Sequence, residues 1–148
     1  MLTNGFTSVC GSSLLTNTRA VTAAHCWFDG SNQAFQIVVV LGSTTLFTGG
    51  TRLTTNEVEM HASWNPTTIQ NDVAVITIPF VSYNDINNIA LPTGTLLNNL
   101  FAGSIAVAAG YGRTGDSEYH YSIIINISLQ SNSSDLMHSP TTCGDCWA

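Results

Sequence analysis

The sequence has no lysine and carries little charge of either sign. Its 3 basic residues, all arginines, face 9 acids, and only 8% of the 148 residues are charged, which leaves a formal net charge of -6. A surface with so little positive charge repels phosphate backbones, so nucleic acid is not an expected partner. Arg19 and Arg52 are expected to be solvated surface charges.

Long hydrophobic runs are also lacking. A membrane helix needs about 18 or more consecutive apolar residues, whereas the densest apolar run, Ile37 to Leu41, has the length of a strand. No membrane association is expected. Met1 to Gly5 has neither a basic start nor an apolar stretch, so it does not predict a secretory signal. If the parent protein is exported, its leader is expected outside this sequence.

Apolar residues and cysteines are present in informative amounts. A hydrophobic content of 44% with 9% aromatics suits a packed core. The 4 cysteines are an even number, compatible with two disulfides in an oxidising compartment. Sequons at Asn126 and Asn132 point weakly to the same compartment.

The chain alternates short β-prone segments with turns. These segments are rich in Val, Ile, Thr and aromatic residues and are bounded by Gly, Asn, Pro or Asp. They predict an all-β barrel or sandwich, with one helical turn around Ala23 to Phe28. The predicted strands are Val9–Leu15, Arg19–Thr22, Phe35–Leu41, Glu57–His61, Val73–Pro79, Ser104–Ala109 and Ser122–Leu129.

A polar, proline-containing stretch from Asn87 to Gly94 interrupts the strands and suits a linker. We place a domain boundary near Thr95, between residues 1–94 and residues 95–148. The first part is long enough for a six-stranded barrel, whereas the roughly fifty residues of the second supply only two or three strands. The second unit is therefore expected to be an incomplete barrel with unpaired edges.

Two motifs carry the chemistry. Histidine is the usual general base near neutral pH, and Val21-Thr22-Ala23-Ala24-His25-Cys26 resembles the histidine box of the trypsin and chymotrypsin-like serine proteases. Asn71-Asp72-Val73-Ala74-Val75-Ile76 resembles the aspartate box of the same family, at close to the family's separation from His25.

Other stretches extend this resemblance from about Phe6 to Arg113, in the family's order. They are Cys10-Gly11-Ser12-Ser13-Leu14-Leu15, His61-Ala62-Ser63-Trp64-Asn65-Pro66 and Ala109-Gly110-Tyr111-Gly112-Arg113. The absence of lysine also resembles secreted digestive proteases of insect larvae.

The resemblance implies two perpendicular six-stranded barrels with a catalytic cleft between them, of which this chain would hold the first barrel and part of the second. It implies His25 as general base and then general acid, Asp72 as the acid that orients it, and a Cys10–Cys26 disulfide. Protein or peptide substrates and protease inhibitors are the implied partners, in a secreted setting. No cofactor and no metal are expected.

The nucleophile of the family has no match. Its Gly-Asp-Ser-Gly-Gly string does not occur, and Gly115-Asp116-Ser117-Glu118 continues without the paired glycines, so Ser117 is interpreted as a surface loop residue. Cys146 as a thiol nucleophile lacks the following glycines as well. A redox or zinc role for the Cys143/Cys146 pair lacks a βαβ pattern and a second cysteine pair, which favours an unpaired or structural tail.

Three hypotheses remain open. The chain is part of a secreted serine endopeptidase and is inactive as given, because the serine and the oxyanion hole are missing; or it is a protease-like binding module or decoy; or it is a truncated gene product without independent function. The family's Ile-Val-Gly-Gly amino terminus and its specificity pocket have no counterpart in the sequence, so substrate preference is not predicted. The histidines outside the box, His61, His120 and His138, are expected to be structural.

Overall fold

The computed structural model describes residues 5, 7–82, 86–99, 101, 104–110, 113–115, 118–119 and 123–128. The chain divides into two compact units, the first over Met1–Ile89 and the second beginning at Ala90. This division falls a few residues before the boundary expected near Thr95. The assignment of residues 1–94 and 95–148 to a complete and an incomplete barrel stays a prediction.

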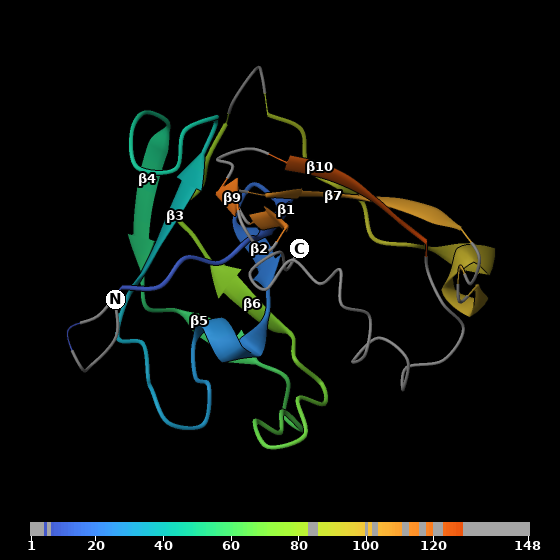
Figure 1. Ribbon diagram of the computed structural model, residues 1–148, viewed down its shortest axis with the longest axis horizontal. Coiled ribbons are helices and arrows are strands. Elements are labelled where there is room, and N and C mark those ends of the chain that lie inside the picture. The colour runs from blue at the N-terminus through green and yellow to red at the C-terminus, as the bar shows by residue number, and fades with distance from the viewer. Residues whose placement is uncertain are drawn as a thin grey trace. The chain divides into compact units, whose positions relative to one another are not determined.

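Within its described residues, the first unit contains six strands and one short helical turn (Figure 1). Four of the strands form an antiparallel sheet in the order β1-β2-β6-β5, and β3 pairs with β4 in a separate antiparallel ribbon. The elements are β1 (Ser13–Thr16), β2 (Arg19–Thr22), η1 (Ala24–Cys26), β3 (Ile37–Leu41), β4 (Thr51–Thr55), β5 (Val58–Met60) and β6 (Ala74–Thr77).

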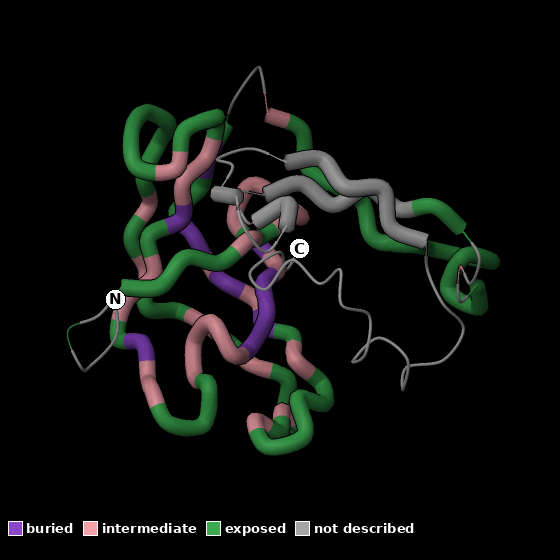
Figure 2. The backbone as a smooth tube through the Cα atoms, viewed as in Figure 1, coloured by how far each residue is buried: buried purple, intermediate pink, exposed green. Residues whose placement is uncertain are grey.

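The core of this unit lies between the four-stranded sheet and the β3–β4 ribbon. Alternate residues of β2 and β6 are buried, as expected for strands with one face towards a core. Ala20 and Ile76 of the sheet form one buried cluster with Val39 of the ribbon, and Ile78 and Val81 complete it. Leu14, Ile37, Leu41, Leu53 and Val58 pack against this cluster. Figure 2 shows the buried positions along these strands.

The β4 strand was not among the predicted strands. Thr51–Thr55 has a single large apolar residue, Leu53, so the sequence shows almost no apolar alternation there. In the structure β4 pairs with β3 over five residues, and Leu53 lies opposite Val39 and packs against the core. The threonines fit a strand because their branched side chains suit a pleated surface.

In the part of the second unit that the structure describes, β7 pairs with β10 and β8 with β9, both antiparallel. Its elements are η2 (Gly94–Asn98), β7 (Ile105–Gly110), β8 (Arg113–Gly115), β9 (Glu118–Tyr119) and β10 (Ile123–Ser128). Strands β7 and β10 match the predicted Ser104–Ala109 and Ser122–Leu129 closely. The prediction of a single helical turn is wrong, because η2 forms a second one. All residues of η2 are exposed, so no apolar period marks it in the sequence.

Among the described residues, no helix is long and apolar enough to cross a membrane.

Candidate active site

The pairing of β2 with β6 brings the two predicted site residues together. Strand β2 ends at Thr22, which lies opposite Ala74, the first residue of the antiparallel strand β6. Residues just after β2 and just before β6 therefore emerge at the same end of the sheet. His25 lies three positions after Thr22 and Asp72 two positions before Ala74, so the sheet register fixes their proximity.

His25 sits in the tight η1 turn that directly follows β2. Ala23 and Ala24 before it are buried, at 7% and 0% exposure, so their small side chains let the turn pack closely against the sheet. The amide of Cys26 donates to the carbonyl of Ala23, and the amide of Trp27 to that of Ala24. The side chain of His25 retains 31% of its exposure, which keeps the imidazole within reach of solvent.

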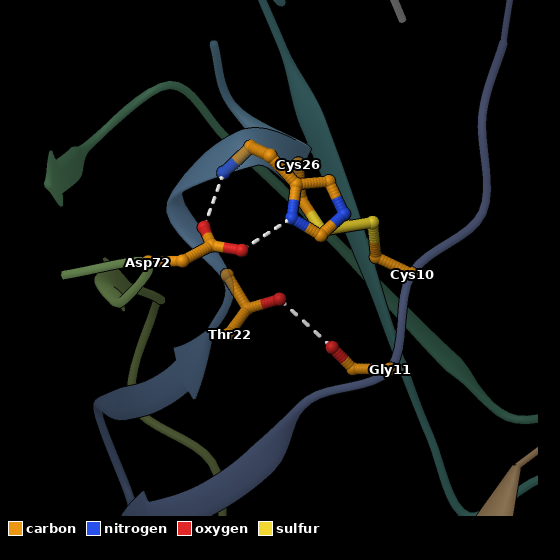
Figure 3. Close-up of a disulfide and its surroundings, with 6 residues drawn as sticks. Cys10, Gly11, Thr22, Cys26 and Asp72 are labelled. Carbon is orange, nitrogen blue, oxygen red and sulfur yellow. Dashed lines mark hydrogen bonds and ion pairs between the residues drawn. A yellow bond between two sulfur atoms is a disulfide. The ribbon is translucent and has the colours of Figure 1, made fainter. Parts of the chain in front are cut away.

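The carboxylate of Asp72 binds His25 at two points (Figure 3). Its Oδ1 accepts the backbone N–H of His25 at 2.8 Å, and its Oδ2 accepts the ring Nδ1–H at 2.7 Å. An ionised carboxylate has only acceptors, so Nδ1 of a neutral imidazole carries the proton and Nε2 presents its lone pair. The Asp72 side chain is only 10% exposed, which shields both bonds from water. Ring orientation and tautomer are therefore set by one side chain.

The loop between β5 and β6 presents Asp72. Met60 and Ala74 are paired at the base of this loop, and the amide of His61 donates to the carbonyl of Val73 above them. Asn71 adopts a left-handed conformation with a φ of 58°, which asparagine tolerates better than most residues. Its side-chain amide donates to the carbonyl of Ser63 at 2.9 Å. The backbone turn at Asn71 thus aims the next residue, Asp72, at the η1 turn.

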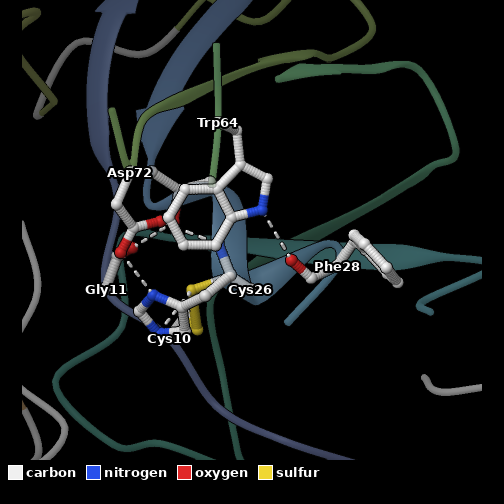
Figure 4. Close-up of polar contacts among 8 residues, drawn as sticks. Cys10, Gly11, Cys26, Phe28, Trp64 and Asp72 are labelled. Carbon is white, nitrogen blue, oxygen red and sulfur yellow. Dashed lines mark hydrogen bonds and ion pairs between the residues drawn. A yellow bond between two sulfur atoms is a disulfide. The ribbon is translucent and has the colours of Figure 1, made fainter. Parts of the chain in front are cut away.

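Trp64 joins this loop to the segment that follows η1. Its indole Nε1–H donates to the carbonyl of Phe28 at 3.0 Å, and Figure 4 shows the indole nitrogen facing that oxygen. The side chain is half-buried. The bond connects the loop of Asp72 with the turn of His25 at a second place, independent of the Asp72 carboxylate.

A disulfide anchors the other side of the η1 turn. Cys26 is bonded to Cys10, with 6.3 Å between the two Cα atoms. The backbone carbonyl of Gly11, the residue after Cys10, accepts a hydrogen bond of 2.8 Å from the hydroxyl of buried Thr22 (Figure 3). The disulfide also lies against the imidazole, since Sγ of Cys26 is 3.7 Å from Nε2 of His25.

Asp29 lies in the loop just beyond η1. Its carboxylate accepts hydrogen bonds from the side chain of Asn32 and from the amides of Asn32 and Ser31. These bonds, the one from the Asn32 side chain above all, hold the pKa of Asp29 below its ordinary value. A smaller contribution comes from the charge of protonated His25.

The other sequence candidates lie away from this pair or outside the described residues. His61 is exposed, and its Nδ1 accepts the amide of Ser63 at 3.0 Å in a local turn. Arg19 and Arg52 are exposed, as expected. Ser117, His120, His138, Cys143 and Cys146 lie outside the described residues.

Four supporting residues were not singled out from the sequence for a role: Gly11, Thr22, Trp64 and Asn71. All four fall inside the motifs that carried the resemblance. The asparagine directly before Asp72 is the clearest signal, because Asn is enriched at left-handed turns.

Comparisons with known proteins identify the family of the chain. The family model described as Trypsin matches residues 1–144. A collagenase of Hypoderma lineatum is 36% identical over 143 residues, covering 92% of this chain and 54% of the relative. A trypsin of Sarcophaga bullata is 40% identical over 93 residues, covering 58% of this chain and 36% of the relative. The chain thus spans about half the length, or less, of these curated relatives.

Two solved structures share the fold. The HL collagenase structure superposes with a TM-score of 0.80 at 32% identity, covering 94% of this chain and 59% of that one. The structure of a scabies mite inactivated protease paralogue gives a TM-score of 0.66 at 26% identity, covering 84% of this chain and 54% of that one. With the family match over residues 1–144, these likenesses establish that the chain belongs to the trypsin family of serine proteases and has a partial trypsin-like β-barrel fold.

Proposed function

We propose that this chain carries the general base and the orienting acid of a secreted serine endopeptidase, with His25 as the base and Asp72 as the acid. The observation that supports this most directly is the 2.7 Å hydrogen bond from Nδ1 of His25 to Oδ2 of Asp72, in a chain of the trypsin family of serine proteases. Proteins or peptides are the proposed substrates, and protease inhibitors are proposed ligands of the same surface.

The roles follow from the two nitrogens of the imidazole. With its proton on Nδ1 held by Asp72, His25 offers Nε2 to accept a proton from a serine hydroxyl as that oxygen attacks the substrate carbonyl. The positive charge that then develops on the ring lies beside the carboxylate of Asp72, which stabilises it. His25 returns the proton to the leaving amine, and the same cycle with water releases the acyl group.

The family's serine nucleophile has no matching motif in this chain. The sequence contains no Gly-Asp-Ser-Gly-Gly string. We therefore propose that these 148 residues alone do not hydrolyse peptide bonds. A serine-directed fluorophosphonate and a peptide ester test this directly: neither labelling nor turnover is expected, and covalent labelling would contradict the proposal.

A chimera tests the proposed roles themselves. Residues 1–110 would be joined to the second half of a relative that supplies Gly-Asp-Ser-Gly-Gly, and ester hydrolysis would be measured. We expect activity that falls by about 10⁴-fold or more on His25→Ala, because a triad acts as a unit. His61→Ala, an exposed histidine of the same unit, should leave activity unchanged. A folded chimera whose activity survives His25→Ala would refute the assignment.

A second function, a non-catalytic binding module or decoy, is favoured by one observation. One of the two solved structures described above is that of an inactivated protease paralogue. A binding module would retain the surface around His25 without turnover. Binding of a protease inhibitor to the purified 148-residue chain, measured by calorimetry, would support this function, and its absence together with an active chimera would favour the endopeptidase.

A further inference from the structure

Three metal-ligand atoms converge beside the imidazole. The sulfurs of Cys10 and Cys26 and a ring nitrogen of His25 all lie within 4.8 Å of one another, and no other such group of three occurs within the described part of the chain. We propose that these residues form a redox-gated Cys₂His site, which binds a zinc-class ion when the Cys10–Cys26 disulfide is reduced and not while it is closed.

The spacing fits a tetrahedral ion. With Zn–S and Zn–N bonds of ordinary length, a sulfur and a nitrogen on one tetrahedral zinc lie about 3.6 Å apart. Sγ of Cys26 and Nε2 of His25 are already 3.7 Å apart. Two sulfurs on the same ion lie about 3.8 Å apart, farther than bonded sulfurs, so the disulfide must open before an ion can enter. Cys10 is exposed, which gives a reductant access to the bond.

The imidazole is already prepared as a ligand. Asp72 accepts the Nδ1 proton at 2.7 Å, so Nε2 is the ring nitrogen that carries a lone pair, and it lies 3.7 Å from Sγ of Cys26. A carboxylate on the far nitrogen of a ligating histidine is the usual outer-shell partner in zinc sites, where it fixes the tautomer and raises the basicity of the ligand. Asp72 would take this role without moving. A water molecule or an added anion would complete four-coordination.

The redox step balances with a phosphine as reductant. The phosphine attacks one sulfur, the S–S bond breaks, and water hydrolyses the resulting adduct to phosphine oxide and two thiols, so that two electrons pass from phosphorus to sulfur. Binding of the divalent ion then releases the two thiol protons, because only thiolates ligate. The neutral imidazole contributes its lone pair and releases no proton.

This inference does not depend on the proposed function, since it needs only the cluster itself. It has one consequence for that function. An ion on Nε2 occupies the lone pair that a general base uses, so metal binding and proton transfer at His25 exclude each other.

Titration with Co²⁺ tests the proposal, because tetrahedral thiolate-bound Co²⁺ gives intense charge-transfer and visible d–d bands. Cys143→Ser/Cys146→Ser is the starting chain, so that the other cysteine pair cannot bind the ion. After phosphine reduction we expect these bands with one ion per chain, and competition by Zn²⁺ should abolish them. The oxidised chain should give no such bands.

Matched variants separate the three-ligand site from a simple cysteine pair. His25→Ala should weaken Co²⁺ binding at least tenfold and Asp72→Asn by about 10 to 100-fold, whereas His61→Ala should leave it unchanged. Should reduction loosen the fold, the ion should restore the strand signal in circular dichroism, since metal binding would then drive folding. Failure of the reduced chain to give the bands, or equal affinity in the His25→Ala variant, overturns the proposal.

Discussion

Asp72 binds the backbone of His25 as well as its ring. The carboxylate accepts the His25 amide at 2.8 Å through Oδ1 and the ring nitrogen at 2.7 Å through Oδ2. The hydrogen bond from the backbone N–H fixes the position of the η1 turn relative to the β5–β6 loop. The hydrogen bond from the ring nitrogen fixes the orientation of the imidazole within that turn. One side chain therefore joins two loops that are far apart in the sequence.

Replacing Asp72 by asparagine should destabilise the fold. The amide keeps one acceptor oxygen and turns a donor group towards the other His25 nitrogen, so a largely buried, charge-assisted bond is lost. Bonds of this kind contribute about 1.5–3 kcal/mol, and we expect a loss of that size in the free energy of unfolding, measured with urea. Glu59→Gln, which neutralises an exposed carboxylate on β5, is the matched control and should change stability little. Equal effects of the two substitutions would contradict the prediction.

Removing the Cys10–Cys26 bond should cost about 3 kcal/mol, because the bond closes a loop of 16 residues that is otherwise free in the unfolded chain. The measurement compares Cys10→Ser/Cys26→Ser with its parent, both carrying Cys143→Ser/Cys146→Ser, in urea without reductant. Adding reductant should lower the urea midpoint of the parent and leave that of the variant in place. If reductant left the urea midpoint of the parent unchanged, the disulfide would not contribute to stability.

Replacing Ile69 by asparagine should stabilise the fold. Its φ of 55° is left-handed, a conformation that costs a β-branched residue about 1–2 kcal/mol, and its side chain is 49% exposed, so little packing is lost. We expect Ile69→Asn to raise the free energy of unfolding by roughly 1 kcal/mol. Ile69→Val keeps the branched carbon and should give no gain. A loss of stability in the asparagine variant would mean that the packing of the isoleucine side chain contributes more than its backbone strain costs.

Asp29 should make stability depend on pH in the acid range. Because hydrogen bonds, first that of Asn32, lower the pKa of Asp29 in the folded chain, the group stabilises the fold above its unfolded-state pKa. That contribution is lost as pH falls through the folded-state pKa. Asp29→Asn should therefore lower the thermal midpoint at neutral pH and converge with the wild type at acid pH. A constant difference between the two chains across this range would contradict the lowered pKa.

The sequence predicts most of the first unit because its strands have one buried face. Arg19–Thr22 and the segment Val73–Pro79 appear as β2 and β6, each with alternate residues buried. Strand β4 was not predicted because Thr51–Thr55 shows almost no apolar alternation, although its threonines suit a strand and it pairs with β3 over five residues. The η2 turn escaped because it buries nothing.

The sequence predicts the candidate pair itself, but not the contacts that hold the two residues in place. The two boxes name His25 and Asp72, yet a motif does not tell which atoms meet. That Oδ1 of Asp72 serves a backbone amide, that Asn71 turns left-handed, and that Trp64 reaches the Phe28 carbonyl all depend on how two distant loops face each other. Such contacts are tertiary and leave only single polar or aromatic letters in the sequence.

By accepting the backbone N–H of His25, Asp72 has a structural role that is independent of any reaction. A lineage that stops cleaving anything still needs the η1 turn to fold, so selection for a stable chain continues to penalise changes at Asp72. Residues that only touch substrate lose that protection at once. We therefore expect the histidine–aspartate arrangement to decay more slowly than the rest of a catalytic apparatus, and to survive as a fossil in chains that have lost every other part of it.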